Sequence, residues 1–257
     1  MHELGALEGR HRASRAMPQG LAPTERRSRL ARWFDSWMRV LGMALVLFLI
    51  IRTFLIEAFQ IPSASMERTL LAGDFLFVNK AVYGAQIPGT DARLPGFDTP
   101  GRGDIIVFAF PRNPELNYVK RVIGVPGDTL AMAGGRLMRN GLPHAEPYVQ
   151  RLDQARDLFD AQFSWQRAYL AATSPDARRL YHPTRDTWGP IVVPAGKYFV
   201  LGDNRDNSSD SRYWGFVDAG AVKGRPLVVY FSYDREAGDR LPWLTDIRWG
   251  RLGSVIR

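Results

Sequence analysis

The stretch NYVKRVIGV, residues 117–125, is rich in β-branched and aromatic residues, and a Pro-Gly-Asp turn follows it. Both features are typical of a strand. Tyr118, Lys120 and Val122 then point to one face of that strand, and Val119 points to the other. Because Lys120 is flanked on its own face by an aromatic and a β-branched residue, we expect desolvation to lower the pKa of its amine. A strand lysine whose amine reaches solvent is the alternative.

Similar strand-like runs lie on both sides of this stretch, at residues 74–84, 104–110, 197–202 and 226–233. Gly, Pro, Asn and Asp bound them, as expected for strands joined by turns. LAMAGGRLMRNG, residues 130–141, predicts a hairpin with Gly134-Gly135 at its tip and a second turn at Asn140-Gly141. There is no alternation of strands and helices. The sequence therefore predicts a mostly β protein.

One segment departs from this pattern. Residues 150–172 are rich in Arg, Asp, Gln, Ala and Leu, and their apolar residues approximate helical spacing. Together with the polar stretch as far as His182, the segment predicts a surface lobe inserted in the β scaffold.

A membrane-length apolar segment precedes the strands. Between residues 37 and 56, 16 of 20 side chains are apolar, and a helix of that length spans about 30 Å, the thickness of a hydrocarbon core. A buried soluble helix or a cleaved signal peptide are the alternatives. We expect a basic tail at 1–35, an anchor at 36–57 and an exported domain at 58–257, with an inserted lobe at about 129–196.

The charges of the tail predict the orientation of the anchor. Residues 1–35 hold seven Arg against four acidic residues, a net charge of 7 − 4 = +3. The positive-inside rule then places the N-terminus in the cytoplasm and residues 58–257 outside.

Composition excludes several kinds of site. The chain has no cysteine, so disulfides and a thiol nucleophile are ruled out. The net charge of +8 is spread along the chain, and no nucleic-acid-binding signature accompanies it. A Ser-His-Asp triad would need His144 or His182, both in polar, Pro-containing contexts. We expect no nucleic-acid partner and no cofactor.

A serine and a lysine form the leading catalytic hypothesis. Ser65 lies in FQIPSASM, residues 59–66, nine residues past the apolar segment. Only four of the 34 Lys and Arg residues are lysines, and Lys, unlike Arg, can lose its proton when desolvated. Lys120 is thus the candidate base for Ser65. In an extended segment Ser63 would face the same way as Ser65, and its hydroxyl with the Ser65 N–H could form an oxyanion hole. Two solvent-facing loop serines are the alternative.

A third polar motif is GDNRDNSSDSRYWGFV, residues 202–217. A loop of turns and salt bridges is one interpretation. Calcium is disfavoured because the spacing and the terminal Glu of an EF-hand are missing, so no metal site is expected.

Taken together, these motifs resemble the type I signal peptidases, the bacterial leader peptidase family. QIPSASM, GDFLFVNK, RGDIIVF with YVKRVIGVPGD, and GDNRDNSSDSRYWGFV occur in the family's order after an anchor, within residues 55–130 and 197–217. The resemblance implies antiparallel sheets in a coiled, barrel-like catalytic core. It also implies a membrane-bound enzyme of the bacterial inner membrane that removes signal peptides after small residues, in an Ala-x-Ala-like pattern.

The resemblance also implies roles for individual residues. Ser65 would be the nucleophile, Lys120 the general base, Ser63 an oxyanion donor and Ser208 the residue that orients the Lys120 amine. Asp210 and Arg212 would form a structural ion pair. Shallow pockets for the substrate residues at −1 and −3 would be lined by Phe59, Ile61, Met66, Tyr118 and Val119.

The sequence departs from the family's pattern in three places. Ala64 replaces the usual Gly, Glu67-Arg68 stands where x-Pro is common, and residues 142–196 do not align well. None of these departures removes a catalytic group. The expected partners are signal peptides of preproteins, membrane lipid and the translocation machinery.

Two other functions remain as alternatives. One is a cytosolic, self-cleaving Ser-Lys peptidase of the repressor type, against which the anchor argues. The other is a membrane-anchored assembly or binding protein without catalysis, which would be expected to lack Ser65 or Lys120.

Overall fold

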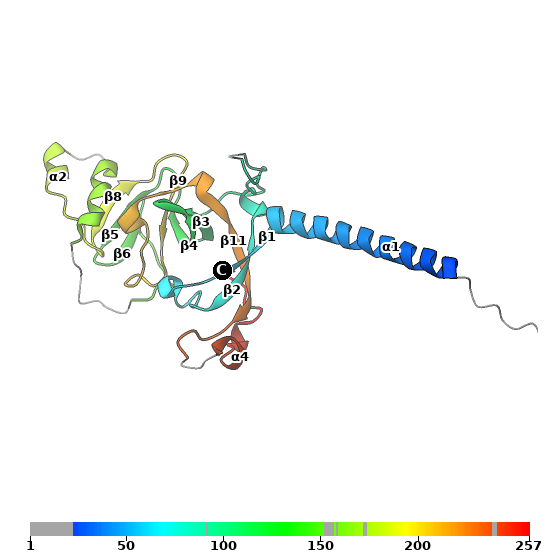
Figure 1. Cartoon of the computed structure of the whole chain (residues 1–257). Helices are drawn as coiled ribbons and strands as arrows, with labels where there is room; N and C mark the ends of the chain where they lie inside the picture. The colour runs from blue at the N-terminus through cyan, green and yellow to red at the C-terminus, as the bar shows by residue number, and fades with distance from the viewer. Residues whose placement is uncertain (1–22, 91, 152–156, 158, 172–173, 238–240) are drawn as a thin grey trace, which may run out of the picture. The chain divides into compact units, whose positions relative to one another are not determined.

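The computed structural model describes residues 23–90, 92–151, 157, 159–171, 174–237 and 241–257. The chain divides into two compact units, Met1–Phe48 and Leu49–Arg257. Helix α1 (Pro23–Ile50) continues into a π-helical turn at Ile51–Leu55 (Figure 1). Among the described residues, one helical span is long and apolar enough to cross a membrane. It covers Ala31–Leu55, with a mean hydropathy of 2.1, and overlaps the predicted anchor.

The larger sheet is antiparallel throughout. In the described part of the chain it has seven strands, in the order β1-β2-β11-β3-β4-β9-β10. Their bounds are β1 (Ile56–Gln60), β2 (Asp74–Asn79), β11 (Val222–Ser232), β3 (Ile105–Phe110), β4 (Asn113–Gly124), β9 (Lys197–Leu201) and β10 (Val217–Asp218). Register shifts interrupt β11 and β4, and such bulges bend a strand and increase its twist. The predicted mostly β, antiparallel fold is confirmed.

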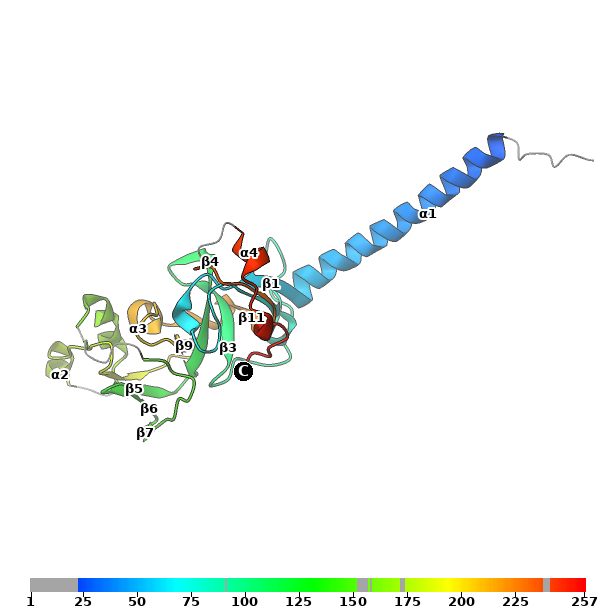
Figure 2. The same cartoon turned by 90° about the horizontal axis from the view of Figure 1, so that it is seen from below.

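A smaller antiparallel sheet is formed within residues 129–192. Its strands, as far as the structure describes them, follow the order β7-β6-β5-β8. They are β5 (Thr129–Ala133), β6 (Arg136–Arg139), β7 (Leu142–Pro143) and β8 (Trp188–Val192). The predicted hairpin joins β5 to β6, where Gly134 and Gly135 both have positive φ. Figures 1 and 2 show this sheet in the part of the Leu49–Arg257 unit that also carries the short helix α2 (Pro175–Arg179).

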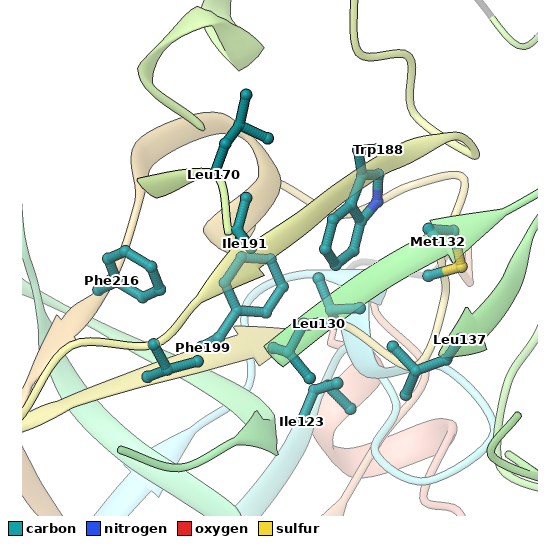
Figure 3. Packing of buried hydrophobic residues seen from close by; sticks show 11 residues of the cluster. Ile123, Leu130, Met132, Leu137, Leu170, Trp188, Ile191, Phe199 and Phe216 are labelled. Atoms are coloured by element: carbon teal, nitrogen blue, oxygen red, sulfur yellow. The ribbon is translucent and has the colours of Figure 1, made fainter. Parts of the chain in front are cut away.

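Apolar side chains cover both faces of the larger sheet. On β3, Ile105 and Val107 belong to one buried cluster, and Ile106 and Phe108 belong to another. A third cluster joins the two sheets (Figure 3) and is formed by Ile123, Leu130, Met132, Leu137, Leu170, Trp188, Ile191, Val193, Phe199, Leu201 and Phe216. Burial on both faces explains why the strands appear as nearly continuous apolar runs in the sequence.

The expected helical lobe differs from the structure. Within residues 150–172, a 3-10 helix covers Ala161–Tyr169, while residues 152–156, 158 and 172 lie outside the described residues. Trp165 Nε1 donates a hydrogen bond of 2.9 Å to the Arg212 carbonyl at the short helix α3 (Ser211–Trp214). The buried side chain of Gln166 reaches the same carbonyl at 3.5 Å. The segment therefore packs against residues 202–217, which we call the polar loop, instead of forming only a surface lobe. The remaining helix, α4, is Pro242–Thr245.

Candidate active site

Ser65 lies in a tight turn directly after the first strand. Ser63 is extended, with φ −137° and ψ 161°, and a 3-10 turn covers Ala64–Met66. The expectation that both serines lie in an extended segment is therefore wrong at Ser65. The turn nevertheless brings the two hydroxyl oxygens to 3.4 Å from each other. Met66 anchors the turn in the core because its side chain is 1% exposed and its carbonyl accepts a bond from the Leu70 N–H at 2.8 Å.

Lys120 lies in β4, where it pairs with Ile106 of β3 and directly precedes Arg121, the first residue that pairs with β9. Its side chain is 4% exposed, and Ser65 is 9% exposed. The amine contacts Ser65 Oγ at 2.7 Å and donates to the Val119 carbonyl at 3.0 Å. The structure thus brings together the two residues that the sequence predicted as nucleophile and base.

Burial lowers the pKa of the Lys120 amine to about 8. The negative charges of Asp210 and Asp203 oppose this effect, and the positive charge of Arg212 adds to it. At about pH 7, a pKa of about 8 leaves roughly one amine in ten neutral, compared with about one in 2,500 for an ordinary lysine. Burial thus gives this lysine a neutral fraction large enough to accept a proton.

Gly202 allows the polar loop to pass close to Ser65. A Cβ at this position would lie 2.2 Å from Ser208 Oγ and 2.5 Å from the Ser65 carbonyl oxygen. The Asn204 N–H donates to that same carbonyl at 3.1 Å. The loop thus fixes the backbone of Ser65, and only glycine leaves enough room for this approach.

Ser208 is buried beside this contact. Among the described residues its hydroxyl has no hydrogen-bond partner within 3.5 Å, so the expected bond to the Lys120 amine is not formed there, although the hydroxyl is near enough to Asp210 to help lower the pKa of that carboxyl. A buried hydroxyl without a partner is uncommon, and its place next to Gly202 puts it within the site.

Asp210 and Arg212 form a buried ion pair at 2.8 Å behind the site. Asp210 also accepts the Gly202 N–H at 3.1 Å and caps helix α3. Burial would raise the pKa of Asp210, but the Arg212 charge and these hydrogen bonds hold it below its ordinary value.

The other acids of the polar loop also form ion pairs with arginines. Asp203 pairs with Arg121, and Asp206 pairs with Arg185.

Several supporting residues were missed by the sequence analysis. Glu146 pairs with Arg205, whose side chain is fully buried, and Gln150 forms a bridge with Asn204. These contacts tie residues 146–150 to the polar loop. The one signal in the sequence was a charged residue, Arg205, among turn-forming residues. This signal does not identify Glu146, which lies 59 positions away, as the partner of Arg205.

A cavity of about 310 Å³ opens beside Ser65 and Lys120. Its walls include all five residues predicted to contact substrate, Phe59, Ile61, Met66, Tyr118 and Val119. They also include Ser63 and four residues of the quoted motifs that were not predicted individually to contact substrate, Pro62, Asn117, Asn207 and Ser209. This cavity, which we call the substrate pocket, has partly apolar walls next to Ser65 and Lys120, an arrangement that suits a peptide-cleaving site.

This chain is similar to known proteins over most of its length. The sequence profile of the family described as "Signal peptidase, peptidase S26" matches residues 34–231. The chain is 37% identical to Signal peptidase I of Pseudomonas aeruginosa over 236 residues, which cover 82% of this chain and 75% of that protein. It is 38% identical to Signal peptidase I of Leptolyngbya laminosa over 205 residues, or 77% of this chain and 80% of that protein. A crystal structure of a signal peptidase I from Enterococcus faecalis shares 36% identity, with a TM-score of 0.33, and covers 49% of this chain and 96% of that one.

Proposed function

The chain belongs to the signal peptidase family, peptidase S26, and we propose that it removes signal peptides as a membrane-anchored serine endopeptidase with Ser65 as nucleophile and Lys120 as general base. The observation that carries this assignment is the 2.7 Å contact between the buried Lys120 amine and Ser65 Oγ. The enzyme is a serine peptidase by family, and its substrates are the signal peptides of preproteins.

The proposed reaction begins when the lone pair of the neutral Lys120 amine accepts the Ser65 hydroxyl proton. Ser65 Oγ attacks the scissile carbonyl carbon, and Lys120 then gives the proton to the leaving amine of the mature chain. Water hydrolyses the remaining ester. Developing charge on the carbonyl oxygen would be stabilised by the Ser63 hydroxyl and the Ser65 N–H.

Three supporting residues complete the proposed machinery. We assign Ser208 the task of orienting the Lys120 amine once substrate is bound, and the ion pair of Asp210 and Arg212 the task of holding the loop in place. The charge-paired acids of this loop argue for a purely protein-based site.

The substrate would bind as an added strand between β1 and β4. The first strand lies at the edge of the described sheet, and residues 117–119 pair with β3 in the described register, whereas β9 pairs only from Arg121 onward. Both segments therefore offer backbone groups to an extended peptide. The substrate pocket, with its modest volume, favours small side chains at −1 and −3 and hence an Ala-x-Ala-like site.

The apolar span supports anchorage in the bacterial inner membrane, and the net positive charge of residues 1–35 supports an N-terminus in the cytoplasm. In this orientation residues 58–257 lie outside, where the C-terminal end of a signal peptide leaves the bilayer. The translocation machinery that delivers preproteins is then a partner on the same surface.

Cleavage of a preprotein by the reconstituted full chain tests this function. Wild type should release the mature protein with a new N-terminus after the small residue at −1, and Ser65→Ala should release none above background. Equal turnover by the two proteins would reject Ser65 as nucleophile. Lack of turnover by wild type would favour the non-catalytic binding protein.

A further inference from the structure

Two adjoining cavities lie on the exported unit, away from the substrate pocket. They have volumes of about 280 and 350 Å³ and share four lining residues, Glu57, Lys80, Gln86 and Pro88. We call the two together the basic groove. Its remaining lining residues are Leu49, Arg52 and Thr53 in the first cavity and Gly89, Arg93 and Lys223 in the second.

The basic groove begins at the residues that end the apolar span. Leu49, Arg52 and Thr53 belong to Ala31–Leu55, the span long enough to cross a bilayer. The Lys80 N–H donates a 2.8 Å hydrogen bond to the Leu55 carbonyl, which ties the groove to the end of this span. Given the membrane anchorage proposed above, the groove lies at the depth of the lipid headgroups.

Positive charge dominates the described lining of the groove. It holds four cations, Arg52, Lys80, Arg93 and Lys223, and one acid, Glu57, which lies 3.4 Å from Lys80. Among the described residues neither Lys223 nor Arg93 has a carboxylate partner. Arg93 donates to the carbonyls of Ala219 and Val222, and its buried Nε has no partner there.

Hydration by solvent does not fully stabilise the cations of the groove. The Lys80 side chain is 18% exposed, and Arg93 and Lys223 are partly buried, so all three give up part of their hydration. The positive-inside rule also disfavours Lys and Arg next to the exported end of a span. Two of the chain's four lysines nevertheless lie here. An anion bound in the groove would offset both the lost hydration of these cations and their unfavourable position next to the exported end of the span.

We propose that the basic groove binds the phosphate of an anionic phospholipid headgroup in the outer leaflet of the membrane. Phosphate oxygens would accept hydrogen bonds from Lys80, Arg93 and Lys223, while Arg52 faces the neighbouring headgroups. Such a contact adds a second attachment to the membrane and fixes the height of the exported unit above the bilayer.

The test measures lipid selectivity of the full chain in phosphatidylcholine vesicles with a trace of spin-labelled lipid. The fraction of motionally restricted label is compared for phosphatidylglycerol and phosphatidylcholine probes. Wild type should prefer phosphatidylglycerol at least about fivefold, the equivalent of about 1 kcal/mol for one basic side chain at a membrane surface. The groove variant Lys80→Gln/Arg93→Gln/Lys223→Gln should lose this preference.

A matched variant removes the same number of cations elsewhere. Arg136→Gln/Arg179→Gln/Lys197→Gln lies outside the groove and should keep the wild-type preference. Equal selectivity in all three proteins would overturn the proposal. So would complete displacement of the lipid by inorganic phosphate at an equal molar ratio, because a free anion would then be the ligand.

Cleavage of a soluble peptide in neutral detergent separates this proposal from the proposed function. The groove variant should cleave at the wild-type rate there, since no groove residue lines the substrate pocket. Failure of wild type to cleave any preprotein would remove the peptidase assignment and leave the measured lipid selectivity standing.

Discussion

The amine of Lys120 lies 2.7 Å from the Ser65 hydroxyl oxygen, although the two residues are 55 positions apart in the sequence. The contact joins the central part of β4 to the turn that follows β1. Both side chains are buried, so an ammonium ion is disfavoured and the neutral amine is accessible. This contact supports the proposal that Lys120 acts as a base on Ser65 by direct proton transfer.

The first prediction concerns the pH dependence of cleavage. Because the base must be deprotonated, kcat/KM should fall about tenfold for each pH unit below the pKa of Lys120 and level off above it. With the pKa lowered to about 8, the profile should bend at about pH 8.

Lysine-selective 13C labelling measures the same pKa directly, since the chain has only four lysines. The 13Cε signal that Lys120→Met removes should titrate at about pH 8. Titration of the Lys120 signal at about 10.4, the ordinary lysine value, would contradict the predicted shift.

The second prediction concerns stability against pH. A lysine whose folded pKa is lowered binds fewer protons in the native state than in the unfolded state between the two pKa values, so stability rises with pH in that window. For Lys120 the window runs from about 8 to 10.5. Lys120→Met should therefore gain up to about 3 kcal/mol in pH-dependent stability relative to wild type at about pH 7.

Urea unfolding in detergent at a series of pH values measures this difference. The excess in free energy of unfolding of Lys120→Met over wild type should shrink between about pH 8 and 10.5, and its pH-dependent part should be gone above about pH 10.5. A difference that stays constant with pH would mean that Lys120 titrates alike in the folded and unfolded chains.

The third prediction uses the close approach at Gly202. Gly202→Ala places a methyl group against Ser208 Oγ and the Ser65 carbonyl, so the turn at Ala64–Met66 or the loop must shift. We expect a loss of about 1–3 kcal/mol in stability and a strong drop in kcat. Gly220→Ala is the matched control, because a Cβ there meets no atom within 4 Å. Equal activity of the two variants would refute the tight contact.

The fourth prediction concerns the buried ion pair. Arg212→Met leaves the Asp210 carboxylate buried without its partner, which should cost about 3–5 kcal/mol. Lys197→Met, which breaks the more exposed pair with Asp218, should cost no more than about 1 kcal/mol. Chemical unfolding of both variants gives the comparison. Similar losses for the two would show that the 2.8 Å contact between Asp210 and Arg212 carries no special stability.

The strands and the apolar span could be predicted from sequence because each depends on local composition. β-Branched residues bounded by turns identified the cores of β3 and β4, and the double glycine identified the hairpin of β5 and β6. Strand ends were less certain, since β4 begins at Asn113, four residues before the quoted stretch. Flanking residues join a strand when a neighbouring strand offers hydrogen bonds, and sequence alone does not show that neighbour.

Local reasoning failed where distant segments set the conformation. Alternation predicted an extended segment through Ser65, but a 3-10 turn forms and its Met66 packs into the core. Helical spacing predicted an α-helix in the lobe, but Ala161–Tyr169 adopts 3-10 geometry with Trp165 bound to the Arg212 carbonyl. The pairing of Glu146 with Arg205 depends in the same way on contacts between separate parts of the chain.

Preprotein cleavage by Lys120→Arg tests the central claim most directly. Arginine keeps the positive charge but does not give up its proton in proteins. If Lys120 is the base for Ser65, the Arg variant should be folded, as judged by protease resistance, and should lose at least about 100-fold in kcat at every pH. Cleavage by Lys120→Arg at a rate near that of wild type would contradict the assignment of Lys120 as general base.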